Sequence, residues 1–154
     1  MKLQWVVAAC ALLVGCSSDS GGSLEGKPVQ ITAMAPSYDS SSDTVDLSIS
    51  LTNISKQPLR AVQIEIRGFD SAGRPVNAGG PGGVAVVSLY GPYEAGAKVG
   101  PVTVPKLWTG SDVRCLEVTE INASGLDYST SIIDGAAANN LVAGDARRVC
   151  RGAN

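Results

Sequence analysis

The strongest pattern in this chain is the alternation of apolar and polar residues with a period of two. It is clearest from Val45 to Thr52, where every second residue is Val, Ile or Leu and the residues between them are Asp, Ser or Thr. The run from Val62 to Arg67 repeats it. Because side chains alternate between the two faces of a strand, each run predicts a strand that is buried on one side only.

Five further runs are strand-like, and turn-forming residues separate them. Turns are indicated by the Gly-, Pro-, Asn- and Ser-rich stretches, and residues 91–100 are expected to form one of them. The alternation in the run that ends at Ala123 slips near Thr119 and Glu120, which indicates a β-bulge. The five runs are Val29–Ala33, Val84–Tyr90, Val102–Val104, Val113–Ala123 and Tyr128–Ile133.

About seven short strands without helical periodicity predict an all-β fold. The expected architecture is an Ig-like antiparallel β-sandwich over residues 28–135, in which two sheets share one core. A small closed barrel is the alternative. In the segment 136–154, residues 136–140 are expected to form one helical turn.

The N-terminus resembles the signal peptide of a bacterial lipoprotein. Lys2 precedes an apolar run, Trp5–Val14, that is too short to span a bilayer, which takes about 20 residues in a helix. The run ends in Leu-Val-Gly before Cys16, as in a lipobox. The resemblance implies that residues 1–15 are removed and that Cys16 receives a diacylglyceryl thioether, usually followed by N-acylation. An ordinary secretory signal, cleaved to give a soluble product, is the alternative.

Residues 16–27 are expected to form the lipidated Cys and a flexible tether, because Ser, Gly and Asp dominate them. By resemblance to enteric-type sorting, Ser17 directs the lipoprotein to the outer membrane, facing the periplasm. The formal net charge is −2 at pH 7, and no basic surplus is available to bind nucleic acid.

Of the four cysteines, Cys10 leaves with the signal peptide and Cys16 is modified. Cys115 and Cys150 remain in an oxidising compartment, and we expect a disulfide that ties the C-terminal segment back to a strand. Free thiols are the alternative. The bond would add on the order of 4 kcal/mol through the loop that it closes. Neither cysteine belongs to a CxxC motif, so a redox role is disfavoured.

The composition disfavours an enzyme. The chain contains no His, which removes His-based triads and zinc sites with imidazole ligands. No thiol nucleophile remains if the disulfide forms, and no carboxylate pair has the pattern of a glycosidase site. The sequence therefore predicts no catalytic residue, no resident metal and no cofactor.

Four further features have both a structural and a functional interpretation. The Gly-rich residues 79–83 are expected to be a loop, because no Lys-Ser/Thr or helix follows, as a phosphate loop requires. Asp39 and Asp43 form either a solvated turn or a weak Ca²⁺ site. The arginines at 147, 148 and 151 form a solvated tail or contact anionic lipid.

Aromatic residues supply the remaining candidate site. Trp108, with Tyr90 and Tyr93, would make a platform for a sugar or a peptide. Core packing is the commoner role for a large aromatic in a sandwich and is favoured for Trp108. Tyr93 is expected to be the exposed ring. Tyr93 and Trp108 are therefore the candidate ligand contacts.

Four segments together resemble the Ig-like domains of bacterial lipoproteins, of the FxLYD type and its relatives. They are LSISLTN (Leu47–Asn53), IEIRGFDSAGRPV (Ile64–Val76), PYEAG (Pro92–Gly96) and RCLEVTEINA (Arg114–Ala123). The resemblance implies a fold and a cell-surface setting and no chemistry. The leading hypothesis is thus a membrane-anchored envelope lipoprotein with a non-catalytic binding or assembly module for an envelope protein. A small-ligand or ion-binding accessory lipoprotein is the alternative.

Overall fold

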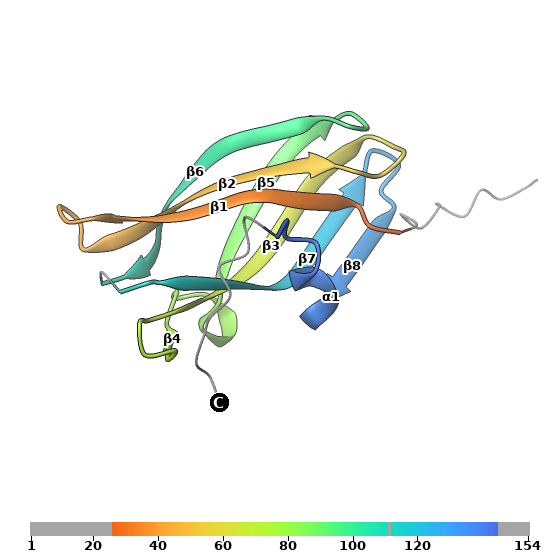
Figure 1. Cartoon of the computed structure of the whole chain (residues 1–154). Helices are drawn as coiled ribbons and strands as arrows, with labels where there is room; N and C mark the ends of the chain where they lie inside the picture. The colour runs from red at the N-terminus through yellow and green to blue at the C-terminus, as the bar shows by residue number, and fades with distance from the viewer. Residues whose placement is uncertain (1–25, 111, 145–154) are drawn as a thin grey trace, which may run out of the picture.

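Two antiparallel sheets pack face to face in the computed structural model, which describes residues 26–110 and 112–144 (Figure 1). The smaller sheet has the strand order β1-β2-β6, and the larger has the order β4-β3-β7-β8, with β5 also paired to β3. The strands are β1 (Val29–Asp39), β2 (Thr44–Asn53), β3 (Leu59–Phe69), β4 (Pro75–Val76), β5 (Ala85–Tyr93), β6 (Lys98–Thr109), β7 (Cys115–Gly125) and β8 (Thr130–Asp134). The predicted all-β sandwich is confirmed.

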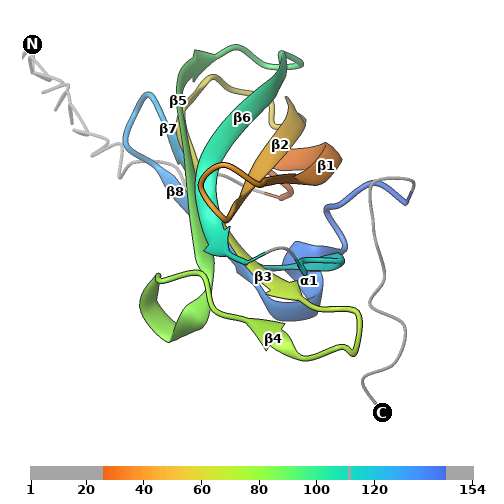
Figure 2. The same ribbon diagram turned by 90° about the vertical axis from the view of Figure 1, so that its left-hand side faces the viewer.

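The core lies between the two sheets and is made by the alternating apolar positions. On β2 the residues Leu47 and Ile49 are fully buried, and on β3 so are Val62, Ile64 and Ile66. Each such side chain contributes about 1.5–3 kcal/mol by leaving water. The view in Figure 2 shows the β1-β2-β6 layer beside the layer that contains β3, β5, β7 and β8.

The expected turn over residues 91–100 is wrong, since only residues 94–97 separate β5 from β6. The glycines in this stretch belong to strands, and neighbouring strands approach them closely. A Cβ atom on Gly91 would lie 2.5 Å from the carbonyl oxygen of Leu59, and Gly100 has φ of 103°, which favours glycine. The strand β6 has twelve residues, whereas the sequence pattern showed only Val102–Val104.

The predicted bulge in β7 is confirmed. Glu120 pairs with Glu65 and Val118 pairs with Ile66, so Thr119 is an extra residue on β7. The bulge keeps the apolar residues of β7 facing the core on both sides of the slip.

A short helix, α1 (Gly135–Asn139), follows β8 and confirms the expected helical turn. The chain then returns to the smaller sheet, where Val142 forms a parallel bridge with Ile31 of β1. In the described ranges, no helix has both the length and the apolar character to cross a membrane.

Asn53 is a fully buried polar residue that joins two turns at one end of the sandwich. Its Nδ2 group donates to the carbonyl oxygens of Gln57 (3.0 Å), Tyr93 (3.0 Å) and Glu94 (3.1 Å). Its Oδ1 atom accepts from the backbone N–H of Ser55 at 3.0 Å and from the Ser55 hydroxyl at 2.7 Å. The side chain therefore connects the β2–β3 turn to the β5–β6 turn.

Candidate functional site on the outer face of the larger sheet

The strand register places outward-facing residues of the larger sheet in three rows. The first crosses Tyr90, Ala61, Ser124 and Thr130, and the second crosses Ser88, Gln63, Asn122 and Ile132. The third crosses Val86, Glu65, Glu120 and Asp134. Because cross-strand neighbours have Cβ atoms about 5 Å apart, each row is a continuous strip of side chains. We call this surface the outer face.

Large apolar and aromatic side chains are exposed at one end and in the middle row of the outer face. Tyr90 is 78% exposed on β5, Tyr128 is 73% exposed in the β7–β8 turn, and Ile132 is 62% exposed on β8. The Arg60 guanidinium of β3 lies over the Tyr128 ring, 4.7 Å from its centroid. Exposed rings with an adjacent Arg are typical of protein interfaces.

The third row gives the opposite end of the outer face a different character. Glu65, Glu120 and Asp134 lie on β3, β7 and β8, which are neighbouring strands in the sheet, and all three are acidic. In the chain segments that the structure describes, no three His, Cys, Asp or Glu residues are arranged to hold a metal ion. The outer face therefore has an aromatic end with Arg60 and an acidic end.

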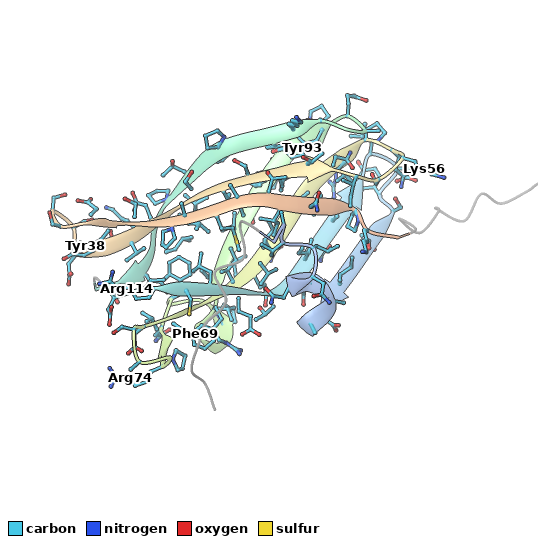
Figure 3. The ribbon with its side chains drawn as sticks, viewed as in Figure 1. Tyr38, Lys56, Phe69, Arg74, Tyr93 and Arg114 are labelled. Atoms are coloured by element: carbon cyan, nitrogen blue, oxygen red, sulfur yellow. The ribbon has the colours of Figure 1, made fainter. Side chains whose placement is uncertain are left out.

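The expectation that Tyr93 is the exposed ring is wrong. Tyr93 ends β5 and packs partly against the core, and its hydroxyl donates to the carbonyl oxygen of Tyr90 at 2.8 Å. Partial burial raises the pKa of Tyr93. Tyr90 points outward because its partner Ala61 is on the outer side of β3. In Figure 3, Tyr93 and Lys56 are both far from Tyr38, which lies at the other end of the sandwich.

Trp108 is buried in the core, with 1% of its surface exposed. Core packing is the role that the sequence favoured for it over ligand contact. Trp108 lies on β6 and pairs with Val45 of β2. A Cβ atom on Gly68 of β3 would lie 2.9 Å from the indole Nε1 atom, so glycine leaves the space that the ring fills. Trp108 and Tyr93 are not brought together on one surface.

The carboxylates of Asp39 and Asp43 serve the turn between β1 and β2. Asp39 accepts hydrogen bonds from the Ser41 backbone N–H at 2.9 Å, the Ser41 hydroxyl at 2.7 Å and the Ser42 hydroxyl at 2.8 Å. Asp43 accepts from the Tyr38 hydroxyl at 2.9 Å, and this bond raises the pKa of Tyr38. This arrangement supports the turn interpretation of the loop.

Three more loop carboxylates act in the same way, and with Asp39 we call them the four loop aspartates. Donors in the same or a neighbouring loop hold their pKa values below the ordinary 3.8, because those donors stabilise the ionised form. The main donor is the Ser41 hydroxyl for Asp39, the Arg74 backbone N–H for Asp70, the Arg114 guanidinium for Asp112 and the Ser129 hydroxyl for Asp127.

Several expected sites lie outside the described residues. These are Cys16 and residues 17–25 of the expected tether, the arginines at 147, 148 and 151, and Cys150. Cys115 is buried at the start of β7, and its pairing with Cys150 stays a prediction. Residues 79–83 form a loop with a short 3-10 turn, Pro81–Gly83, ahead of β5.

No protein-family model, curated protein or solved structure matches this chain in the comparisons made. The resemblance to FxLYD-type lipoprotein domains therefore stays a prediction. Sequence analysis missed Arg60, Tyr128 and Ile132 as surface candidates. Alternation alone assigns Ile132 to the outer side of its strand, but it does not show that Arg60 reaches Tyr128, because that contact joins residues 68 positions apart.

Proposed function

We propose that this protein is a lipid-anchored bacterial envelope lipoprotein whose Ig-like sandwich is a non-catalytic module that binds another envelope protein. The observation that carries the proposal is the exposed aromatic end of the outer face. Tyr90, Tyr128 and Ile132 present apolar surface to solvent, and Arg60 adds a charged group that stacks on an aromatic ring. Tyr and Arg are enriched among the residues that dominate binding energy at interfaces.

The charged groups of the outer face are suited to recognition. The strands that carry Glu65, Glu120 and Arg60 are held in a sheet, so little backbone entropy is lost on binding. The absence of His from the sequence argues against acid–base catalysis near neutral pH.

The alternative, binding of a small ligand or an ion, has weaker support. It relied on Tyr93 and on the loop that contains Asp39 and Asp43. The Tyr93 hydroxyl is engaged by the backbone of Tyr90, and the two carboxylates accept hydrogen bonds within their own turn. These groups would have to exchange existing partners for a ligand.

The binding proposal is tested by crosslinking in living cells, followed by purification of the full-length chain and mass spectrometry. The variant Tyr90→Ser with Tyr128→Ser removes both rings, and Tyr38→Ser is the matched control, because it removes a partly exposed tyrosine at the opposite end of the sandwich. We expect one envelope protein to be recovered reproducibly, and to be lost from the double variant only. Equal recovery with all three chains would contradict the role of the outer face.

The lipid anchor is tested separately by Cys16→Ser. Two or more acyl chains hold a protein on a membrane essentially permanently, so the parental chain is expected in the membrane fraction and the variant in the soluble fraction. If the Cys16→Ser chain stays in the membrane fraction, the lipid anchor at Cys16 is refuted. The proposal that the sandwich binds another envelope protein would not be affected.

A further inference from the structure

Apart from the two-residue strand β4, the two sheets have four outer strands in the described residues, and three of these four have features that discourage pairing with another chain. β1 is covered where Ile31 bonds to the C-terminal segment, because its N–H donates to Leu141 at 2.9 Å and its carbonyl accepts from Ala143 at 2.8 Å. β6 contains two prolines, which have no N–H, and Lys106 with φ of 58°. Prolines and irregular backbone are common protections of sheet edges.

The outer edge of β5 is protected in another way. The carbonyl oxygen of Tyr90 accepts the hydroxyl hydrogen of Tyr93 at 2.8 Å, and the strand continues into Gly91 and Pro92. A strand approaching this edge would have to displace the Tyr93 hydroxyl. β8 has no comparable feature: it contains no Pro or Lys, and within the described residues it pairs with β7 alone.

The hairpin turn fixes which backbone groups of β8 face away from β7. The N–H of Tyr128 donates to Gly125 at 3.1 Å, and the N–H of Gly125 donates to Ser129 at 2.8 Å. Pairs in an antiparallel ladder alternate between hydrogen-bonded and non-hydrogen-bonded. Gly125 and Ser129 form a hydrogen-bonded pair. Counting along β8 from this pair, the backbone groups of Ser131 and Ile133 bond to β7.

Thr130, Ile132 and Asp134 are the residues whose N–H and carbonyl groups point away from the sheet. Their side chains lie on the outer face, where Ile132 is largely exposed. Because Ile132 lies midway between Thr130 and Asp134, an antiparallel copy of the same strand can bond to the backbone groups of all three residues in register.

We propose that β8 pairs antiparallel with β8 of a second copy of this chain, on a two-fold axis at Ile132. This arrangement places Ile132 opposite its own counterpart and Thr130 opposite Asp134, and it satisfies about six backbone groups on each side. The larger sheets of the two copies become one continuous sheet. The inference goes beyond the proposed function, because it needs neither the lipid anchor nor an envelope partner.

Charge complementarity selects the antiparallel self-pairing. Asp134 is at the acidic end of the outer face, next to Glu120 and Glu65, and Thr130 is at the end where Arg60 lies over Tyr128. The two-fold axis brings the acidic row of one copy toward the Arg60 end of the other. A parallel pairing of the same two edges would turn the outer faces of the two copies to opposite sides of the joined sheet, so the acidic row of one copy could not lie on the same face as the Arg60 end of the other.

The first test measures association of the full-length chain, purified in detergent, by sedimentation at several concentrations. Ile132→Pro removes an N–H that points away from β7, so the hairpin keeps its own hydrogen bonds. Ser88→Pro is the matched control, because Ser88 occupies the corresponding outward position on the β5 edge. We expect a parental dimer, a dissociation constant raised by about tenfold or more in Ile132→Pro, and little change in Ser88→Pro.

A thermal melt would show whether Ile132→Pro folds. A second variant tests the same pairing if it does not. Ile132→Lys keeps the backbone and places two like charges opposite each other across the axis, so it should also dissociate the dimer. A parental chain that stays monomeric up to about 100 μM, or a dimer that survives both substitutions, would overturn the proposal.

The register is tested by oxidative crosslinking. Ile132→Cys should form a covalent dimer, because paired residues on the axis have Cα atoms about 5.5 Å apart, within disulfide range. Gln63→Cys lies in the same row but two strands inward and should not. Equal crosslinking of the two variants would overturn the register. In cells, Ile132→Cys could instead crosslink to a different protein and not to a second copy of this chain. That result would mean that the β8 edge binds another partner, and it would overturn the proposed self-pairing.

Discussion

The buried side chain of Asn53 is where one atom exchange should have the largest effect on this fold. Asn53→Asp keeps the shape of the side chain and replaces the Nδ2 donor by an oxygen. That oxygen would face the carbonyl oxygens of Gln57, Tyr93 and Glu94, all now within 3.1 Å of the donor. The Nδ2 group has two hydrogens and three acceptors, so one hydrogen is shared.

The cost follows from those contacts. A buried polar group that loses its partner costs about 1–3 kcal/mol. The Gln57 and Glu94 carbonyls keep a second donor each, the Ser55 hydroxyl at 2.8 Å and the Ala97 N–H at 2.9 Å, but all three carbonyl oxygens would face an oxygen where a donor now lies. Some relaxation and water entry reduce the total, so we expect a loss of about 3–5 kcal/mol in the free energy of unfolding. Because a buried carboxylate is costlier than a buried neutral carboxyl, the loss should be larger at pH 7 than at pH 3.

Urea unfolding followed by circular dichroism measures this loss. With an m value of about 2 kcal/mol/M, a loss of 4 kcal/mol lowers the midpoint by about 2 M. Asn77→Asp is the matched control, because Asn77 is exposed and its Oδ1 atom only accepts, from the Gly79 N–H at 3.0 Å. That variant should change the free energy by less than about 0.5 kcal/mol. Equal midpoints for the two variants would refute the role assigned to Asn53.

Three other predictions concern the core, the loops and the C-terminal segment. Gly68→Ala should cost about 1–3 kcal/mol in a thermal melt, because the new Cβ atom would lie 2.9 Å from Trp108 Nε1, whereas Gly144→Ala, with nothing within 4 Å, should be near neutral. The four loop aspartates have lowered pKa values, so their stabilisation is present above pH 3.8 and is lost as the pH falls through their folded pKa values; a melting temperature that does not fall between pH 5 and pH 2.5 would contradict this. Non-reducing peptide mapping should recover Cys115 linked to Cys150, and two free thiols would exclude the bond.

Local patterns in the amino-acid sequence are sufficient to assign the class of fold. The period-two runs at Val45–Thr52 and Val62–Arg67 define which side of each strand is buried, because a strand has only two faces and one of them is polar. The bulge at Thr119 was also visible, since an extra residue must break the alternation. These features are local, so one sequence is enough to show them.

Tertiary structure alone decided the rest. Gly91, Pro92 and Gly100 indicated a turn, yet they lie in strands. Backbone atoms of the neighbouring strands come close to Gly91 and Gly100. The exposure of Tyr90 rather than Tyr93 depends on which residue of β3 lies beside each of them. The open edge of β8 depends on the strand order of the sheet, since an edge is defined only by the absence of a neighbour. Pairing between distant segments sets all three features, and local pattern carries no information about it.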